Sequence, residues 1–222
     1  GSIRWLIDQS PEASHWSCVL AVFLADSGRV EETREVFERI ASGGLARLAR
    51  EKNAPALLAW MARVATFLWD EPRARELYPL LAPYAERNIV LGASSQACLG
   101  SAHRYLGLLA ATCGDVAGAE RHYIAGVAMN ERMAARPVVA CTQHEYARLL
   151  QYRNRPGDRT KARLLIEQAR ATSLVCGMTQ LLDWIERLGP VEAEATPPDS
   201  FSGWSTVRTL PATDVAASDA DP

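Results

Sequence analysis

A recurring pair of amphipathic segments constrains the fold of this chain more than any other feature. From residue 11 to residue 189, apolar residues return every three or four positions, and breakers such as Gly28, Pro72 and Gly157 divide the stretch. This period is typical of helices with one buried face. No stretch alternates clearly between apolar and polar residues, so we expect an all-α protein without strands. The expected helices span residues 11–26, 30–42, 55–69, 72–86, 95–113, 116–134, 137–152, 159–173 and 177–188.

Successive helix pairs follow the tetratricopeptide pattern of small and bulky residues. Weaker copies start at Ser17, Leu58 and Tyr146, and the best copy comprises His103, Leu106, Gly107, Ala110, Ala119 and Tyr123. In this pattern small residues let the two helices of a pair approach closely, and a bulky residue fills the space between pairs. A single pair cannot cover its own apolar face. The sequence therefore predicts a tetratricopeptide-like α-solenoid of about four helix pairs plus a C-terminal capping helix.

The repeat length leaves a second fold open. Equivalent positions on the second helices, Thr33, Ala74, Ala119 and Ala162, are 41, 45 and 43 residues apart. Tetratricopeptide repeats usually have about 34 residues, whereas HEAT-type helix pairs have about 40 to 47. We therefore expect extended helices or loops, with a HEAT-like stack as the alternative.

The composition divides the chain into three regions. Residues 1–10 form an N-terminal extension, whose first two residues we expect to be a cloning remnant. Residues 11–189 form the helical-repeat domain, and residues 190–222 form an acidic tail rich in Pro, Ala and Ser. We expect this tail to be disordered or docked on the body, with Trp204 as a possible anchor. No apolar run reaches the roughly 18 residues that cross a bilayer, so we expect a cytoplasmic protein that does not contact membranes.

Three arginines indicate a binding groove on the expected concave face. The first helix of each pair lines that face, and its exposed repeat positions include Arg63, Arg104 and Arg148. A guanidinium group binds a carboxylate through two parallel hydrogen bonds, so the predicted ligand is an acidic peptide or a carboxylate. The predicted ligand-binding groove comprises Arg63, Thr66, Arg104, His144, Arg148 and Gln151.

The charge distribution suggests one intramolecular partner for this groove. Six acidic residues against Arg208 give the tail a charge of −5, and because the whole chain carries −2, the remainder carries +3. We therefore hypothesise that the tail lies in the arginine-bearing groove and competes with the true ligand.

Metal, catalytic and nucleic-acid sites have less support in the sequence. Cys141 and His144 lie three positions apart, which suits two metal ligands on one helix, but no further ligand follows at a local spacing. The five cysteines never form C-x-x-C. The basic run from Arg153 to Arg163 lacks interleaved aromatic residues, so we read it as a solvated turn. We predict no metal, no cofactor, no catalytic residue and no direct contact with nucleic acid.

Residues 99–173 resemble part of a known group of proteins. The likeness rests on LGSAHRYLGLLAATCGDVAGAERHYIAGVAMNERMAARPVVACTQHEYARLL and on RPGDRTKARLLIEQA. This region resembles the C-terminal repeats of large bacterial ATP-binding signalling proteins, namely LuxR-type regulators related to the maltose activator and ATPases linked to nucleotide cyclases. The resemblance implies a sensor or docking arm beside a nucleotide-binding engine. The sequence has no G-x-x-x-x-G-K-[ST], so ATP hydrolysis is not implied for it.

These observations favour a binding protein over an enzyme. The leading expectation is a protein–protein interaction module, the regulatory or scaffolding arm of a signalling or transcription-regulating protein. The alternative is a small-molecule effector sensor that uses the same groove. A third hypothesis is an enzyme built on a helical-repeat scaffold, which a buried metal or a strongly perturbed Cys–His pair would favour.

Overall fold

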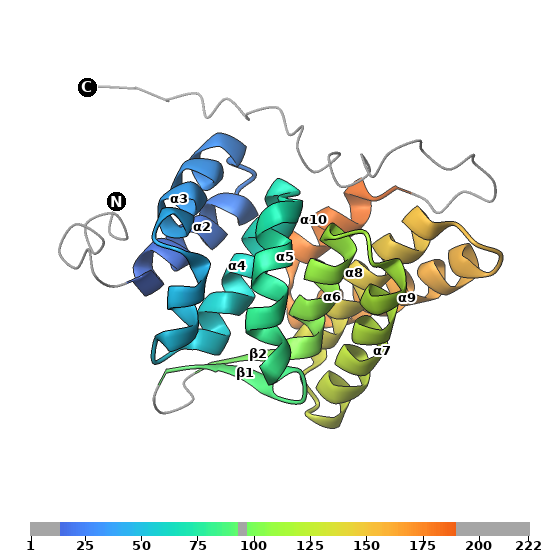
Figure 1. Cartoon of the computed structure of the whole chain (residues 1–222). Helices are drawn as coiled ribbons and strands as arrows, with labels where there is room; N and C mark the ends of the chain where they lie inside the picture. Colours follow the sequence, from blue (N-terminus) through green and yellow to red (C-terminus); the bar gives the residue numbers. More distant parts are fainter. Residues whose placement is uncertain (1–13, 93–96, 190–222) are drawn as a thin grey trace, which may run out of the picture.

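The computed structural model describes residues 14–92 and 97–189, and this part of the chain is mostly helical (Figure 1). The described α-helices are α2 (Ser14–Asp26), α3 (Val30–Ser42), α4 (Ala54–Leu68), α5 (Glu71–Leu81), α6 (Ala102–Thr112), α7 (Val116–Arg132), α8 (Arg136–Arg153), α9 (Asp158–Cys176) and α10 (Thr179–Arg187). The other elements are the 3-10 helices η1 (Leu45–Arg50) and η2 (Ala82–Tyr84) and the strands β1 (Asn88–Leu91) and β2 (Ala97–Ser101).

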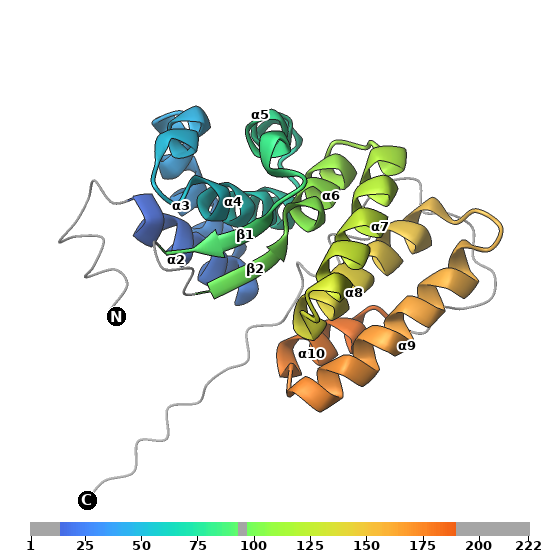
Figure 2. The same cartoon turned by 90° about the horizontal axis from the view of Figure 1, so that it is seen from below.

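The helices pack in sequence order. Helices α2, α4, α6 and α8 contact one another successively, and each also packs against the helix that follows it in the chain. Helix α10 packs on α9. Figure 2 shows the resulting progression from α2 and α3 at one end to α7 and α9 at the other. Helix α10 returns toward α2, because Nε2 of Gln180 donates to the carbonyl of Asp26 at 2.8 Å. Helix α4 has buried residues on every side, because it contacts α2, α3, α5 and α6.

Two helices begin directly after an aspartate whose side chain caps them. The Asp70 carboxylate accepts a hydrogen bond from the Arg73 amide at 3.1 Å, which caps α5. The Asp115 carboxylate accepts one from the Gly118 amide at 2.8 Å, which caps α7. Such caps satisfy amides that have no partner within the helix. The predicted breakers Gly28 and Gly157 lie between helices, as expected.

Small and bulky residues of the repeat pattern meet in the core. A Cβ atom added to Gly107 would lie 2.7 Å from Cε1 of Tyr123, so only glycine allows α6 and α7 to approach this closely. Tyr123 and Phe37 are fully buried, and Tyr78 is half-buried. Ala21, Ala62 and Ala147, the other small residues of the pattern, are also fully buried.

The hairpin β1–β2 contradicts the expectation of a protein without strands. Its strands are antiparallel, with Asn88 opposite Ser101 and Leu91 opposite Ala97. The predicted helix over 95–113 is therefore wrong at its start, because α6 begins only at Ala102. Gly100 explains the difference: it has φ +87°, which a helix does not permit, and a Cβ there would lie 2.3 Å from Cγ1 of Val138.

The end of α5 also differs from the prediction. The expected helix over 72–86 stops at Leu81, and the 3-10 turn η2 takes its place. Pro79 lies inside α5 and Pro83 lies within η2. Proline donates no backbone hydrogen bond and clashes with the preceding turn, so two prolines in close succession end the regular helix.

Candidate ligand-binding groove

A pocket of about 340 Å³ lies where α2, α4, α6, α8 and α10 face one another. This volume falls within the usual range for small-ligand pockets, roughly 300 to 1,000 Å³. The structure brings all six residues of the predicted groove into its lining, namely Arg63, Thr66, Arg104, His144, Arg148 and Gln151.

Arg104 is engaged with a carboxylate of the same chain. Its Nε donates to Oε2 and Oε1 of Glu145 at 2.9 and 3.1 Å, and its Nη2 donates to Oε1 at 2.6 Å. Both residues are only 8% exposed. Burial disfavours the charged guanidinium, but the Glu145 carboxylate outweighs it and raises the pKa of Arg104 well above its usual value. The pair fixes α6 against α8 with two buried, mutually satisfied charges.

Arg63 also has an internal partner. Its Nη2 lies 2.5 Å from Oδ1 of Asp26, the last residue of α2. Burial raises the pKa of the Asp26 carboxyl, and the charges of Arg63 and Arg104 oppose that increase. Two of the three arginines that we expected to grip a ligand thus already bind carboxylates of the protein. The prediction that all three guanidinium groups are available to a ligand is therefore wrong for Arg63 and Arg104.

His144 and Arg148 form the other polar side of the groove, one turn apart on α8. His144 is 3% exposed, and its buried Nε2 has no hydrogen-bond partner among the described residues. Burial, with the nearby charges of Arg148 and Arg104, lowers the pKa of His144 to about 3, so the imidazole is neutral at pH 7. Burial also lowers the pKa of Arg148, although Tyr123 and Glu145 oppose the shift.

Four lining residues that the sequence analysis missed change the chemistry of the groove: Asp26, Glu145, Trp184 and Arg187. The ring centroid of Trp184 lies 6.3 Å from that of His144, with the planes 26° apart. Glu145 was detectable, because it lies three positions before Arg148 and shares its helix face. Trp184 and Arg187 lie on the last described helix, α10. The sequence analysis would have found them only by including that helix among those that line the groove.

The lining has an excess of positive charge. Four arginines (Arg63, Arg104, Arg148 and Arg187) stand against the carboxylates of Asp26 and Glu145, which leaves a net charge of +2. Apolar side chains complete the walls, namely Val22, Ala25, Phe67, Leu108, Trp184 and Leu188. The groove therefore combines an apolar surface with a cationic one.

The described residues offer little for metal or thiol chemistry. Within residues 14–92 and 97–189, no group of three His, Cys, Asp or Glu side chains could hold a metal ion. Burial raises the pKa of Cys141 and raises that of Cys18 to about 12, so both remain protonated thiols at neutral pH. A protonated thiol is a poor nucleophile and a poor metal ligand.

A pair of histidines lies outside the groove, between α5, α6 and α7. Nδ1 of His103 lies 2.9 Å from Nδ1 of His122, whose Nε2 lies 2.8 Å from the Tyr78 hydroxyl. Burial and the neighbouring His103 lower the pKa of His122 to about 4. These hydrogen bonds join α5, α6 and α7.

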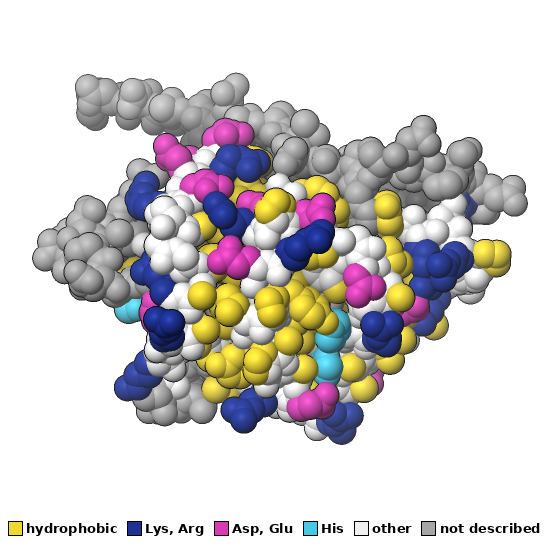
Figure 3. Space-filling view, viewed as in Figure 1, with side chains coloured by type: hydrophobic (Ala, Val, Ile, Leu, Met, Phe, Trp, Pro, Cys, Tyr) yellow, Lys and Arg dark blue, Asp and Glu magenta, His cyan; other side chains and the backbone are white. Residues whose placement is uncertain are grey.

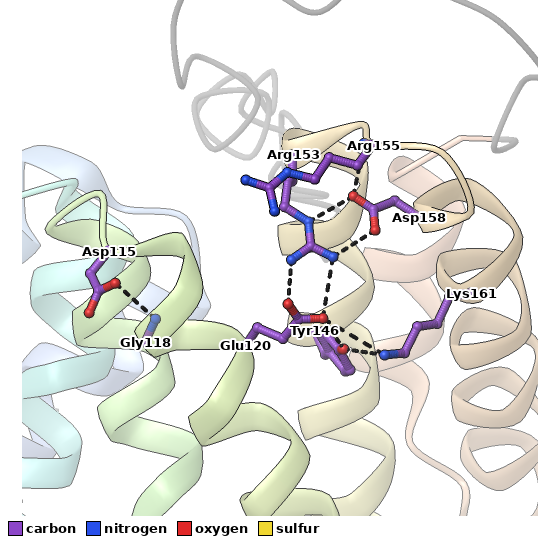
Figure 4. A network of polar contacts seen from close by, with 8 residues as sticks. All are labelled: Asp115, Gly118, Glu120, Tyr146, Arg153, Arg155, Asp158 and Lys161. Carbon is purple, nitrogen blue, oxygen red and sulfur yellow. Dashed lines mark hydrogen bonds and ion pairs between the residues drawn. The ribbon is translucent and has the colours of Figure 1, made fainter.

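The basic turn between α8 and α9 is largely structural. Basic side chains gather near this turn in Figure 3. Figure 4 shows that Arg153 donates to the carboxylates of Glu120 on α7 and Asp158 on α9. The Tyr146 hydroxyl donates to Glu120 at 2.6 Å, and Lys161 completes the cluster. Much of the basic run therefore joins α7, α8 and α9.

Two expectations depend on other parts of the chain. None of the described helices is both long and apolar enough to span a bilayer. Trp204, the possible tail anchor, and the whole of 190–222 lie outside the described residues, so docking of the tail in the groove stays a prediction.

Comparisons of the sequence and structure with protein-family models, curated proteins and solved structures find no match.

Proposed function

We propose that this protein is a non-enzymatic binding module whose groove holds a small anionic effector. The observation that carries the proposal is the pocket of about 340 Å³ in which five helices converge, with four arginines against two carboxylates. A pocket of this size, with apolar walls and a few converging polar groups, suits a small ligand.

The proposed framework is a tetratricopeptide-like α-solenoid of four helix pairs with α10 as its cap. Supporting it, α2, α4, α6 and α8 contact one another in order, and α3, α5, α7 and α9 each follow one of them. The close contact of Gly107 with Tyr123 fits the small-to-bulky packing of such repeats. The pocket then lies on the concave side, because its lining comes from α2, α4, α6, α8 and α10.

In the cell, we propose that this module is the cytoplasmic sensor arm of a bacterial signalling or transcription-regulating protein. The resemblance of residues 99–173 to the repeats of such proteins motivates this role. Ligand binding bridges the first and last described helices and so stabilises one arrangement of the stack. A neighbouring domain or partner protein would detect that arrangement.

Docking of an acidic peptide is the second candidate. The net charge of +2 in the groove favours it, and the peptide would come from a partner protein or from the acidic tail. The internal pairs of Arg63 and Arg104 weigh against it, because they commit two of the four cations that a multiply charged peptide would use.

Thermal denaturation of the full chain tests the effector proposal. The protein is heated with each compound of a ligand panel that contains carboxylates, phosphates, sugars, amines and a hexaglutamate peptide. A ligand at about 100 times its Kd adds about 2.7 kcal/mol, or roughly 5 to 10 °C in Tm. We expect at least one class of small anion to give this increase.

A matched pair of charge reversals locates the binding. Arg187→Glu reverses an exposed charge in the lining, whereas Arg170→Glu makes the same change at an exposed position of α9 outside it. We expect the first variant to lose the increase in Tm and the second to keep it. If no small molecule of any class stabilises the protein, the proposal is wrong, and stabilisation by hexaglutamate alone would establish the second candidate instead.

A further inference from the structure

The side of α9 that faces away from the rest of the described protein is largely apolar. Leu164, Leu174 and Val175 are 54%, 58% and 71% exposed, whereas Ala162 and Ala169 on the inner side are fully buried. The helical period places the three exposed residues together on one side. Isolated exposed apolar side chains are ordinary, but several on one face mark a contact surface. We call this surface the outer face of α9, and its exposed residues are Leu164, Glu167, Ala171, Leu174 and Val175.

No element of residues 14–92 and 97–189 covers the outer face of α9. The helix packs against α8 and α10, and the residues buried between these three helices are Ala140, Ala169, Leu181 and Ile185. Figure 2 shows α9 along the outer edge of the described part, at the end opposite α2 and α3. The end of a stack of helix pairs needs a polar surface to stay soluble. An apolar end therefore indicates that another surface packs on it.

The charges of α9 favour a second copy of the same helix, in the antiparallel direction, as that surface. The first six residues of α9 carry a net charge of +2, from Arg159, Lys161 and Arg163 against Asp158. The last six, residues 171–176, carry no charged side chain, and the final turn of a helix has partly negative carbonyl oxygens. An antiparallel pair places the basic start of each helix against the end of the other. A parallel pair would instead bring the two basic starts together, where they repel.

The outer face is also complementary to itself in the antiparallel direction. Leu164 lies five positions before Ala169, and Leu174 lies five positions after it. A two-fold axis that passes near Ala169 therefore places Leu164 of one copy against Leu174 of the other, and the reverse. Such a contact removes the exposed leucines of both copies from water, which is favourable.

We propose that two copies of this chain associate through the outer faces of α9, packed antiparallel about this axis. Helix α9 contributes no residue to the lining of the groove, so the association does not depend on the proposed function. One helix of 19 residues from each copy forms the contact, over a length of about 28 Å. A contact of this length is at the small end of specific interfaces, below about 1,200 Å² in total, so the dissociation constant is expected in the micromolar range.

Sedimentation velocity of the full chain tests the association. We expect the average mass to rise from that of a monomer toward that of a dimer between about 5 and about 200 µM, a range that brackets the expected dissociation constant. A chain that remains monomeric at the highest concentration would overturn the inference.

Substitutions of Leu174 test both the surface and the direction of packing. Leu174→Lys removes the apolar contact and adds a cation opposite the basic start of the other helix, so we expect the dissociation constant to rise about tenfold or more. Leu174→Glu removes the same contact but places a carboxylate against those cations, so we expect a smaller rise. Equal effects of the two substitutions would contradict the antiparallel direction and overturn the inference.

Phe23→Lys is the matched control. Phe23 on α2 is 57% exposed, close to the 58% of Leu174, but it lies at the other end of the described part. We expect this variant to dimerise as the unaltered protein does. Circular dichroism checks that each variant is folded, and Val175→Lys replaces Leu174→Lys if the latter does not fold. A dimer that persists in both lysine variants of α9, or that Phe23→Lys dissociates as strongly, would place the contact elsewhere and overturn the inference.

Discussion

Burial determines the charge state of single residues in this protein. The imidazoles of His144 and His122 have pKa values lowered to about 3 and about 4, first because they are removed from water and then because cationic or imidazole neighbours disfavour a further proton. Arg104 shows the opposite outcome, because its buried charge meets the Glu145 carboxylate directly. At this scale an oppositely charged partner within hydrogen-bond distance decides whether a buried group stays charged.

The histidines lead to a prediction about pH. The folded pKa values of His144 and His122 lie below the unfolded value of about 6.5, so the unfolded state binds more protons between these values. The free energy of unfolding should therefore fall as the pH falls from about 6.5 toward 4, by about 1.4 kcal/mol per pH unit for each histidine. Urea denaturation at pH 7, 6 and 5 measures this slope.

His144→Phe is the variant that isolates one histidine. Phenylalanine keeps a ring of similar size without a titratable group, so we expect the slope between pH 6 and pH 5 to decrease by about 1.4 kcal/mol per pH unit. Above pH 7.5 both histidines are neutral in both states, and the difference between variant and unaltered protein should no longer depend on pH. An unchanged slope below pH 6 would contradict the lowered pKa of His144.

At the scale of helices and strands, side-chain contacts between elements hold neighbouring helices together. The Tyr146 hydroxyl on α8 donates to Glu120 on α7, and Arg153 at the end of α8 binds both Glu120 and Asp158. Hydrogen bonds to Arg153 lower the pKa of the Asp158 and Glu120 carboxyl groups. These contacts fix the position of α9 relative to the two helices before it.

Arg153→Met should weaken this part of the stack. The substitution leaves two carboxylates of low exposure without their cation, and we expect a loss of about 3 kcal/mol in the free energy of unfolding at pH 7. Because the folded pKa values of Asp158 and Glu120 are lowered, this contribution is present above about pH 4 in the unaltered protein. It disappears as the pH falls through those folded pKa values.

The neighbouring arginine provides the control for this prediction. Arg155 contacts Asp158 through its backbone amide, at 2.9 Å, and its side chain is exposed. Arg155→Met therefore keeps that hydrogen bond and should change the stability by less than about 0.5 kcal/mol. Chemical denaturation at pH 7 and pH 3 compares the two variants, and equal stabilities at pH 7 would contradict the structural role of Arg153.

At the scale of the whole molecule, the first and last described helices meet. Nε2 of Gln180 at the start of α10 donates to the backbone carbonyl of Asp26 at the end of α2, at 2.8 Å. Residues of both helices line the groove. The groove therefore joins segments that lie far apart in the sequence.

Removal of the tail tests the intramolecular competition. A chain that ends at Gly189 lacks the −5 charge of residues 190–222 but keeps every described element. If the tail lies in the groove, the shortened chain should bind labelled hexaglutamate several-fold more tightly than the full chain, because a tethered competitor acts at high effective concentration. Fluorescence anisotropy at low ionic strength measures both affinities, and equal values would remove the hypothesis.

The sequence by itself determined the helical character, the main turns and the face of each first helix that lines the groove. These follow from local properties, namely the three-to-four-residue period, the breaking residues and the small residue at Gly107. Arg63, Arg104, Arg148 and His144 were located for the same reason, because repeat positions convert directly into a helix face.

Only the tertiary structure decided the hairpin and the charges that the groove offers. Strand pairing across β1 and β2 depends on a partner segment and on the close approach of Val138 to Gly100, which no local period reveals. Likewise, the pairing of Arg63 with Asp26 and of Arg104 with Glu145 joins residues 37 and 41 positions apart. Electrostatic partners are set by distance in space, so the sequence could name the arginines but not which of their charges remain for a ligand.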